Sequence, residues 1–182
     1  MKKLYPALAA LALLAGLLAA VGLPVGATSQ AGFAATLEGY QEVPAISTMG
    51  TGTFTASLSS DGMAVSYVLS YADLSGAASA SHIHFGQAGV NGGVAVFLCG
   101  GALPACPGAG GTVSGTFTAQ NVGGPAGQGI APGEFDELLD AMFSGVTYAN
   151  VHTAMHPAGE IRGQIEAVDQ DRRRGRGPQR GR

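Results

Sequence analysis

The chain has 182 residues, with 9 basic and 12 acidic side chains and a formal net charge of −3 at pH 7. Over residues 28–171 all 12 acidic residues are opposed by Arg162 alone, so that segment has a net charge of −11. A body this acidic would repel phosphate groups, and we expect no specific nucleic-acid binding by it. The 155 residues that remain when the first 27 are removed from the 182 are enough for one domain with a hydrophobic core.

Residues 1–27 have the pattern of a secretory signal peptide. Lys2 and Lys3 precede an apolar run, and Val25 and Ala27 occupy positions −3 and −1 of a predicted cleavage site after Ala27. A retained membrane anchor is the alternative, but the apolar run is shorter than the ~20 residues of a spanning helix. We therefore expect a protein that is secreted, periplasmic or located at the cell surface.

From residue 33 onward, apolar and polar residues alternate with a period of two between glycine-rich turns, which predicts β-strands. The clearest predicted hairpin covers residues 52–71, with its turn at residues 59–62. A second hairpin is predicted from residues 80–86 and 93–100. Asn91 and Gly92 are expected to supply the positive backbone angles of its turn.

Cys99 and Cys106 are the two cysteines of the chain, and a Gly/Pro-containing loop separates them. In an exported chain an even pair of this kind predicts a disulfide. Thiolate ligation of a metal is the alternative, and it would require reduced cysteines in an oxidising compartment.

One short helix is predicted within residues 132–145. Phe135, Leu138, Leu139 and Met142 fall on one helical face, and Gly145 is placed to end the helix. Two further strands are predicted at residues 146–153 and 159–168. The total is about seven to nine strands and one short helix, which predicts an all-β antiparallel sandwich or barrel.

Residues 170–182 are rich in arginine and glycine and contain almost no apolar side chains. Such a segment cannot bury enough surface to offset its ordering entropy, so we expect a disordered tail. Contact of its arginines with an anionic surface is the functional alternative to a solvated tail.

The four histidines of the chain lie in two short segments. His82 and His84 belong to "HIH", and His152 and His156 belong to "HTAMH". On a strand, residues i and i+2 face the same side about 6.6 Å apart, so one ion can meet both imidazoles. Because neutral imidazole suits copper and zinc, we predict one copper or zinc ion, copper preferred, held by His82, His84, His152 and His156. Hydrogen bonding of the histidines to backbone in a rim of loops is the alternative.

Glu160 is a possible additional oxygen ligand of this ion. Glu160 and Arg162 are predicted to share a strand face, so we expect Arg162 to pair with an acid such as Glu160. Guidance of an anion toward the metal is the alternative role for Arg162. No Ser/His/Asp order, paired carboxylates or phosphate-binding loop stands out, and we therefore predict no catalytic residues.

Four separated motifs carry a family resemblance: "EVP" at 42–44, "HIHFGQAGVNG" at 82–92, "NVHT" at 150–153 and "HPAGEIRGQ" at 156–164. In this order they resemble the CHRD (chordin-type) domain, over roughly residues 32–167. The resemblance implies an immunoglobulin-like β-sandwich or barrel, here delimited as residues 28–169. It implies little about activity, although in chordin these domains accompany modules that bind growth factors.

A weaker similarity concerns local pattern alone. The "HIH" strand, a later histidine, a small disulfide and a nearby arginine resemble features of copper–zinc superoxide dismutases, but the full set of metal ligands is missing. We therefore expect first an exported metal-binding module. The alternative is a non-catalytic module that binds a cell-surface protein or polysaccharide, and a dismutase-like enzyme ranks behind both.

Overall fold

The computed structural model describes residues 31–169, and the predicted signal peptide and C-terminal tail lie outside these residues. Within them the chain forms nine strands and one α-helix: β1 (Ala31–Glu38), β2 (Thr51–Leu58), β3 (Val65–Ala72), β4 (Ala78–Phe85), β5 (Gly93–Cys99), β6 (Gly111–Phe117), α1 (Phe135–Phe143), β7 (Thr147–Thr153), β8 (Ile161–Gln164) and β9 (Glu166–Asp169). Three single 3-10 turns complete the description: η1 (Gly39–Gln41), η2 (Ala119–Asn121) and η3 (Ala126–Gln128).

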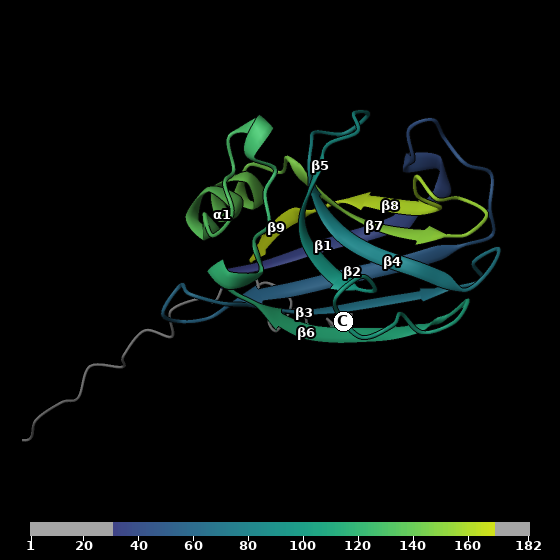
Figure 1. Ribbon diagram of the computed structural model, residues 1–182, viewed down its shortest axis with the longest axis horizontal. Helices are drawn as coiled ribbons and strands as arrows, with labels where there is room; N and C mark the ends of the chain where they lie inside the picture. The colour runs from purple at the N-terminus through teal and green to yellow at the C-terminus, as the bar shows by residue number, and fades with distance from the viewer. Residues whose placement is uncertain (1–30, 170–182) are drawn as a thin grey trace, which may run out of the picture.

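Every strand pair is antiparallel, in the order β5-β4-β7-β8-β1-β2-β3-β6, and β9 pairs with β1. The terminal strands of this path, β5 and β6, contact each other, so the sheet curls into a nearly closed barrel (Figure 1). The prediction of an antiparallel all-β fold with seven to nine strands and one short helix is confirmed.

The interior of the barrel is filled by inward-facing side chains, which alternate with outward-facing ones along strands such as β2 and β3. Burial of each large apolar side chain contributes about 1.5–3 kcal/mol to folding. The fully buried side chains of this core include Phe33, Leu37, Phe54, Leu69, Ile83, Phe117, Ile161 and Ile165. The predicted hairpin corresponds to β2 and β3, whose turn contains Gly62 with φ +74°.

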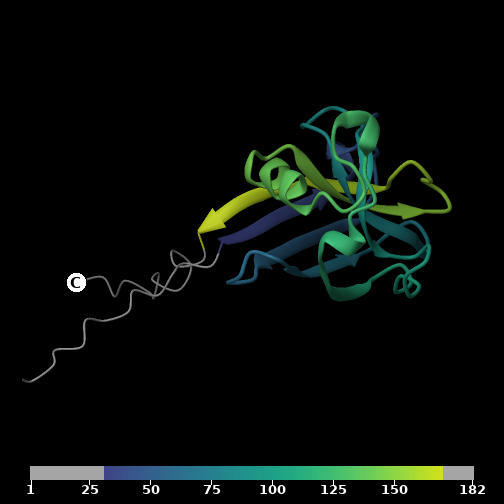
Figure 2. The same ribbon diagram turned by 60° about the vertical axis from the view of Figure 1, so that its left-hand side comes forward.

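The helix α1 covers one end of the barrel beside β9 (Figures 1 and 2). It buries the predicted face, which consists of Phe135, Leu138, Leu139 and Met142. Gly145 follows the helix with φ +69° and donates to the Met142 carbonyl oxygen, as a C-terminal glycine does.

The second hairpin forms as β4 and β5, but the expectation for its turn is wrong. Neither Asn91 nor Gly92 has a positive φ; the connection instead contains Gly89 with φ +78°. Cys99 and Cys106 form the predicted disulfide, with Cα atoms 5.1 Å apart. Among residues 31–169, no helix combines the length and apolar character required to cross a bilayer.

Candidate metal centre

Three of the four histidines project from two neighbouring strands. His82 and His84 lie on β4 and His152 lies on β7, and in the register of this pair His82 faces Asn150 and Ala80 faces His152. Because side chains two residues apart share one face of a strand, the three imidazoles lie on the same side of the sheet. The predicted union of the two histidine segments is therefore realised for three residues.

The opposite face of β4 belongs to the core. Ile83, between the two histidines, is fully buried, as expected from the strand pattern. The pairing of β4 with β5 shifts register directly before His82 and again between Ile83 and His84, so Ala95 and Leu98 of β5 lack a partner residue on β4. Such bulges bend a strand and change the direction of adjacent side chains, and they often occur beside functional sites.

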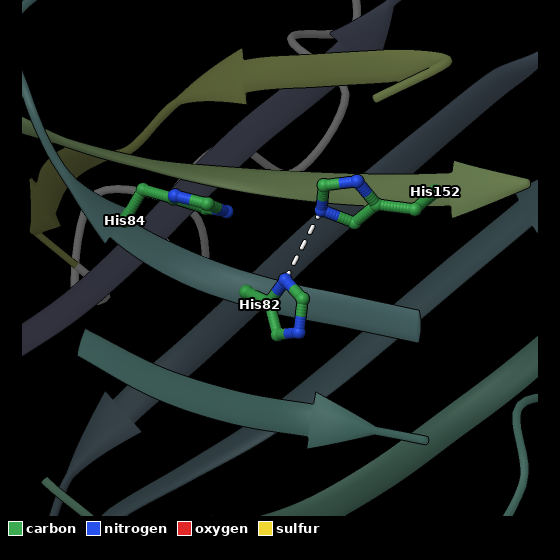
Figure 3. Close-up of side chains that lie close together, drawn as sticks. All are labelled: His82, His84 and His152. Carbon is green, nitrogen blue, oxygen red and sulfur yellow. Dashed lines mark hydrogen bonds between the residues drawn. The ribbon is translucent and has the colours of Figure 1, made fainter. Parts of the chain in front are cut away.

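The histidine cluster, defined as His82, His84 and His152, brings three ligand nitrogens within 4.8 Å of one another. Three points at this spacing lie within about 2.8 Å of a common centre, close to the ~2.0–2.1 Å of a metal–imidazole bond. His82 Nδ1 and His152 Nε2 form a hydrogen bond of 3.1 Å (Figure 3), and two ligands of one ion would have a similar separation. The His84 ring points from β4 toward this pair (Figure 3).

Backbone carbonyl groups fix the tautomers of two of the rings. His84 Nδ1 lies 3.0 Å from the Gly92 carbonyl oxygen, and His152 Nδ1 lies 3.1 Å from that of Pro157. A carbonyl oxygen only accepts, so each Nδ1 carries the proton and each Nε2 presents a lone pair. Metal-binding histidines commonly have this arrangement, in which the outer nitrogen donates and the inner nitrogen binds the ion.

Two ring nitrogens of the cluster are buried without a hydrogen-bond partner among the described residues, namely His82 Nε2 and His84 Nε2. A buried polar atom without a partner costs about 1–3 kcal/mol and calls for an explanation such as a bound ion. For His84 the unpartnered atom is Nε2, whose lone pair faces the other two rings (Figure 3). A metal ion at the centre of the cluster would satisfy it.

The cluster is buried, which keeps its rings neutral. Each of the three side chains is 8–9% exposed. Burial lowers the pKa of His82 and of His84 to about 4, with the charges of neighbouring histidines acting in the same direction. Burial also lowers the pKa of His152. All three histidines are therefore in the neutral, ligand form at neutral pH.

Aromatic rings enclose the cluster. Phe97 of β5 packs edge-on against His82, with ring centroids 4.3 Å apart, and is itself 44% exposed. Tyr148 of β7 stacks on His84, with centroids 4.8 Å apart and nearly parallel planes. These rings cover the His82 and His84 imidazoles on a face that points away from the core.

Arg162 lies next to this aromatic wall. Its guanidinium carbon is 4.3 Å from the centroid of Tyr148, and it donates a hydrogen bond to Asn91 Oδ1 (3.1 Å). It is 2% exposed. Burial raises the pKa of the nearby Glu42 to about 7, although the charge of Arg162 and a hydrogen bond from Asn150 act to lower it.

Glu160 does not join the cluster as an oxygen ligand, and its expected pairing with Arg162 is not formed. Its carboxylate accepts hydrogen bonds from Thr48, from the backbone and hydroxyl of Ser75, and from Thr153. Burial raises the pKa of Glu160, but these hydrogen bonds outweigh it and hold the pKa below its usual value. Glu160 is therefore an ionised, fully hydrogen-bonded carboxylate on the other side of the sheet.

His156, the fourth predicted ligand, does not belong to the histidine cluster. It is partly exposed in the loop between β7 and β8. Its backbone N–H donates to the Thr153 hydroxyl group, and its carbonyl oxygen accepts from Thr153 and Gly159. This loop also provides the Pro157 carbonyl oxygen that orients His152.

Sequence reasoning did not assign roles to the groups that support the cluster, namely the Gly92 and Pro157 carbonyls and the Phe97 and Tyr148 rings. A signal for two of them was available, because Gly92 and Pro157 lie within the motifs that also contain the histidines. No pattern marks Phe97 or Tyr148, whose alternation with neighbouring residues is that of an ordinary strand.

The four sequence motifs converge around the cluster. The Asn91 side chain donates to the Val43 carbonyl oxygen (2.9 Å) and accepts from Arg162. Asn150 donates to Glu42. Together with the contacts of the histidines, these hydrogen bonds connect all four motifs.

Comparison with protein families matches residues 33–165 to the CHRD domain. No curated protein and no solved structure gives a significant match to the chain. The matched range contains every strand from β2 to β8, all four motifs and the whole histidine cluster. The chain therefore belongs to the CHRD domain family.

Proposed function

We propose that this CHRD-domain protein is an exported metal-binding module that holds one copper ion, or alternatively one zinc ion, at the histidine cluster. The observation that supports it is the convergence of three neutral imidazoles, two of them oriented by backbone carbonyl groups. Imidazole nitrogen is a preferred ligand of both metals. Such a module buffers, carries or senses the ion.

Isothermal titration calorimetry of the purified protein tests this function. We expect one Cu(II) or Zn(II) ion per chain, and no binding by the double variant His82→Ala/His84→Ala. His156→Ala is the matched control, because it removes a histidine that lies outside the cluster; its affinity should stay within threefold of the wild type. Absence of binding heat together with a chelator-insensitive unfolding midpoint would falsify the proposal.

Export is proposed from residues 1–27 alone, whose basic start, apolar run and small residues fit a cleaved signal. Mass spectrometry of the protein recovered from outside the cytoplasm is expected to show a chain that begins at Thr28. A chain that retains Met1 in the membrane fraction would instead support the anchor alternative.

A second candidate function is an interaction module at the cell surface, and the outer face of β1, β2, β3 and β6 favours it. This face presents rows of hydroxyl groups and lines a groove of about 470 Å³ over β1 and β2. Hydroxyl pairs connect β3 to β6, at 3.0 Å between Ser66 and Thr116 and 2.9 Å between Ser70 and Thr112. Its exposed hydroxyl residues are Thr36, Thr51, Thr53, Thr55, Ser66, Thr112, Ser114 and Thr116.

A polysaccharide suits this hydroxyl-rich face, because Glu166 is the one charged residue that lines its groove. Co-sedimentation of the protein with insoluble cell-wall polysaccharide tests this candidate. We expect Thr53→Asp/Thr55→Asp to abolish sedimentation and His82→Ala/His84→Ala to leave it unchanged. No sedimentation by the wild type would rule out this function and leave the metal proposal unaffected.

Dismutase-like catalysis ranks behind both functions. It requires an open position on a redox-active ion and a path for its anionic substrate. Arg162, the residue considered for guiding an anion, is buried and already occupied by Asn91 and Tyr148. It therefore lacks a free donor surface toward solvent.

A further inference from the structure

The donor set of the histidine cluster carries no negative charge. Its three ligand groups are neutral imidazoles, and no cysteine, aspartate or glutamate of residues 31–169 belongs to the group. An ion bound there keeps its full formal charge. The unfavourable electrostatic cost of a buried ion grows steeply with that charge, so a donor set without carboxylates favours a monovalent over a divalent ion.

Arg162 places a positive charge beside the cluster, and the carboxyl group of Glu42 lies near that charge. The guanidinium carbon of Arg162 is 4.3 Å from the Tyr148 centroid, which is 4.8 Å from the His84 centroid. These two distances place the guanidinium within about 9 Å of the His84 ring. At this separation and an effective dielectric constant of about 20, each additional positive charge on the ion costs roughly tenfold in affinity.

The surroundings offer little room for a fourth ligand. The partnerless nitrogens of His82 and His84 are buried, and Phe97 and Tyr148 pack against these two rings. Zn(II) sites with three protein ligands retain a water molecule as the fourth ligand. Cu(I) accepts three-coordinate geometry without a bound water, so it suits a buried site with three nitrogens.

From these observations, and resting on the proposed metal-binding function, we infer that the histidine cluster binds copper as Cu(I) in preference to Cu(II) and Zn(II). The selectivity arises from three features: a neutral donor set, the buried positive charge of Arg162, and aromatic enclosure that disfavours a fourth ligand. The bound ion is thus a monovalent soft cation held by three imidazoles.

Anaerobic competition of the purified protein against the chromophoric Cu(I) chelator bicinchoninate, at pH 8, measures the affinity for Cu(I). We expect one Cu(I) per chain, and an X-ray absorption edge of three-coordinate Cu(I).

The midpoint potential of the bound copper gives the ratio of its Cu(I) affinity to its Cu(II) affinity. Cu(I) should bind at least tenfold more tightly than Cu(II), which places the potential at least 59 mV above that of aqueous copper. Parallel chelator competition with Zn(II) should give an affinity for Zn(II) that is weaker than the affinity for Cu(I).

Substitutions of Arg162 test the electrostatic cause. Arg162→Gln removes the charge and is expected to lower the ratio of Cu(I) to Cu(II) affinity about tenfold. Arg162→Lys retains the charge and should leave the ratio within threefold of the wild type. Asn91→Ala, which removes the hydrogen-bond acceptor of Arg162 but no charge, should also leave the ratio unchanged. If Arg162→Gln does not fold, Glu42→Gln replaces it and should shift the ratio in the opposite direction.

The outcomes separate this inference from the function on which it rests. If no metal binds, both fail. If Cu(II) or Zn(II) binds at the cluster as tightly as Cu(I), the metal-binding function stands and the selectivity for Cu(I) is wrong. A ratio that is insensitive to Arg162→Gln and to Glu42→Gln overturns the electrostatic explanation.

Discussion

His84 depends on a glycine for its orientation. Its Nδ1 donates to the carbonyl oxygen of Gly92, and the Gly92 N–H donates to the Tyr148 hydroxyl group (3.1 Å). A Cβ atom on Gly92 would overlap the backbone carbonyl of Phe85, so no other residue fits without a shift of the loop. A glycine at this position is required by close backbone approach and not by a positive φ.

Gly92→Ala should therefore weaken metal binding without removing any ligand. Loss of an outer hydrogen-bond partner of a metal-binding histidine typically lowers affinity by about 10–100-fold. Calorimetric titration with Cu(II) or Zn(II) measures the change. Gln87→Ala, an exposed position in the same connection, is the control and should bind as the wild type does. Equal affinities of the two variants would show that the Gly92 carbonyl does not orient His84.

Glu42 predicts a pH dependence of stability. Its pKa is raised from 4.5 to about 7 in the folded protein, so the folded state holds this proton more tightly than the unfolded chain. The stabilisation is complete below pH 4.5 and is lost as pH rises through 7. Glu42→Gln cannot ionise, so its free energy of unfolding relative to wild type should rise by up to about 3 kcal/mol between pH 4.5 and 8.

Urea unfolding of the chelator-treated wild type and Glu42→Gln at pH 4.5, 6 and 8 measures this difference. Comparison of the two proteins at each pH cancels the titration of the histidines, whose lowered pKa values reduce stability as pH falls below about 6.5. A difference that stays constant from pH 4.5 to 8 would show that Glu42 titrates normally.

At the scale of elements, periodicity predicted the regular parts of the fold and missed the irregular ones. The hairpin of β2 and β3 and the helix α1 follow from alternation and helical spacing, because in both a single buried face determines the pattern. Local turn chemistry predicts a turn at Asn91–Gly92. In the structure these residues serve long-range contacts to Arg162, His84 and Tyr148, which local patterns do not encode.

The helix α1 is expected to contribute to stability and not to metal binding. Leu138 is fully buried in the core at one end of the barrel. Leu138→Ala should lower the free energy of unfolding by about 2–5 kcal/mol, the range for a buried leucine. Glu137→Gln on the exposed side of α1 should change it by no more than about 0.5 kcal/mol. Urea denaturation measures stability, and calorimetry at low temperature should find an unchanged Kd for the folded Leu138→Ala protein.

At the scale of the whole molecule, the site unites segments that are distant in sequence. His82 and His152 are 70 residues apart and come together because β4 pairs with β7. The sequence predicted two histidine segments on one ion, and the structure brings three histidines together. The position of His156 near His152 in the sequence predicts it as a ligand, but the β7–β8 loop contributes the Pro157 carbonyl oxygen to the site instead.

Because β4 and β7 both contribute ligands, metal binding should stabilise the entire domain. An ion that binds only the folded state adds about 2.7 kcal/mol at a free concentration of 100 Kd, which corresponds to a rise in Tm of about 5–11 °C for a domain of this size. Differential scanning calorimetry with and without Zn(II) or Cu(II) measures the rise. His82→Ala/His84→Ala should show no rise, and His156→Ala should show the full rise. An equal rise in the double variant would mean that the metal stabilises the protein at a different place, because that variant lacks two of the three imidazoles that connect β4 to β7.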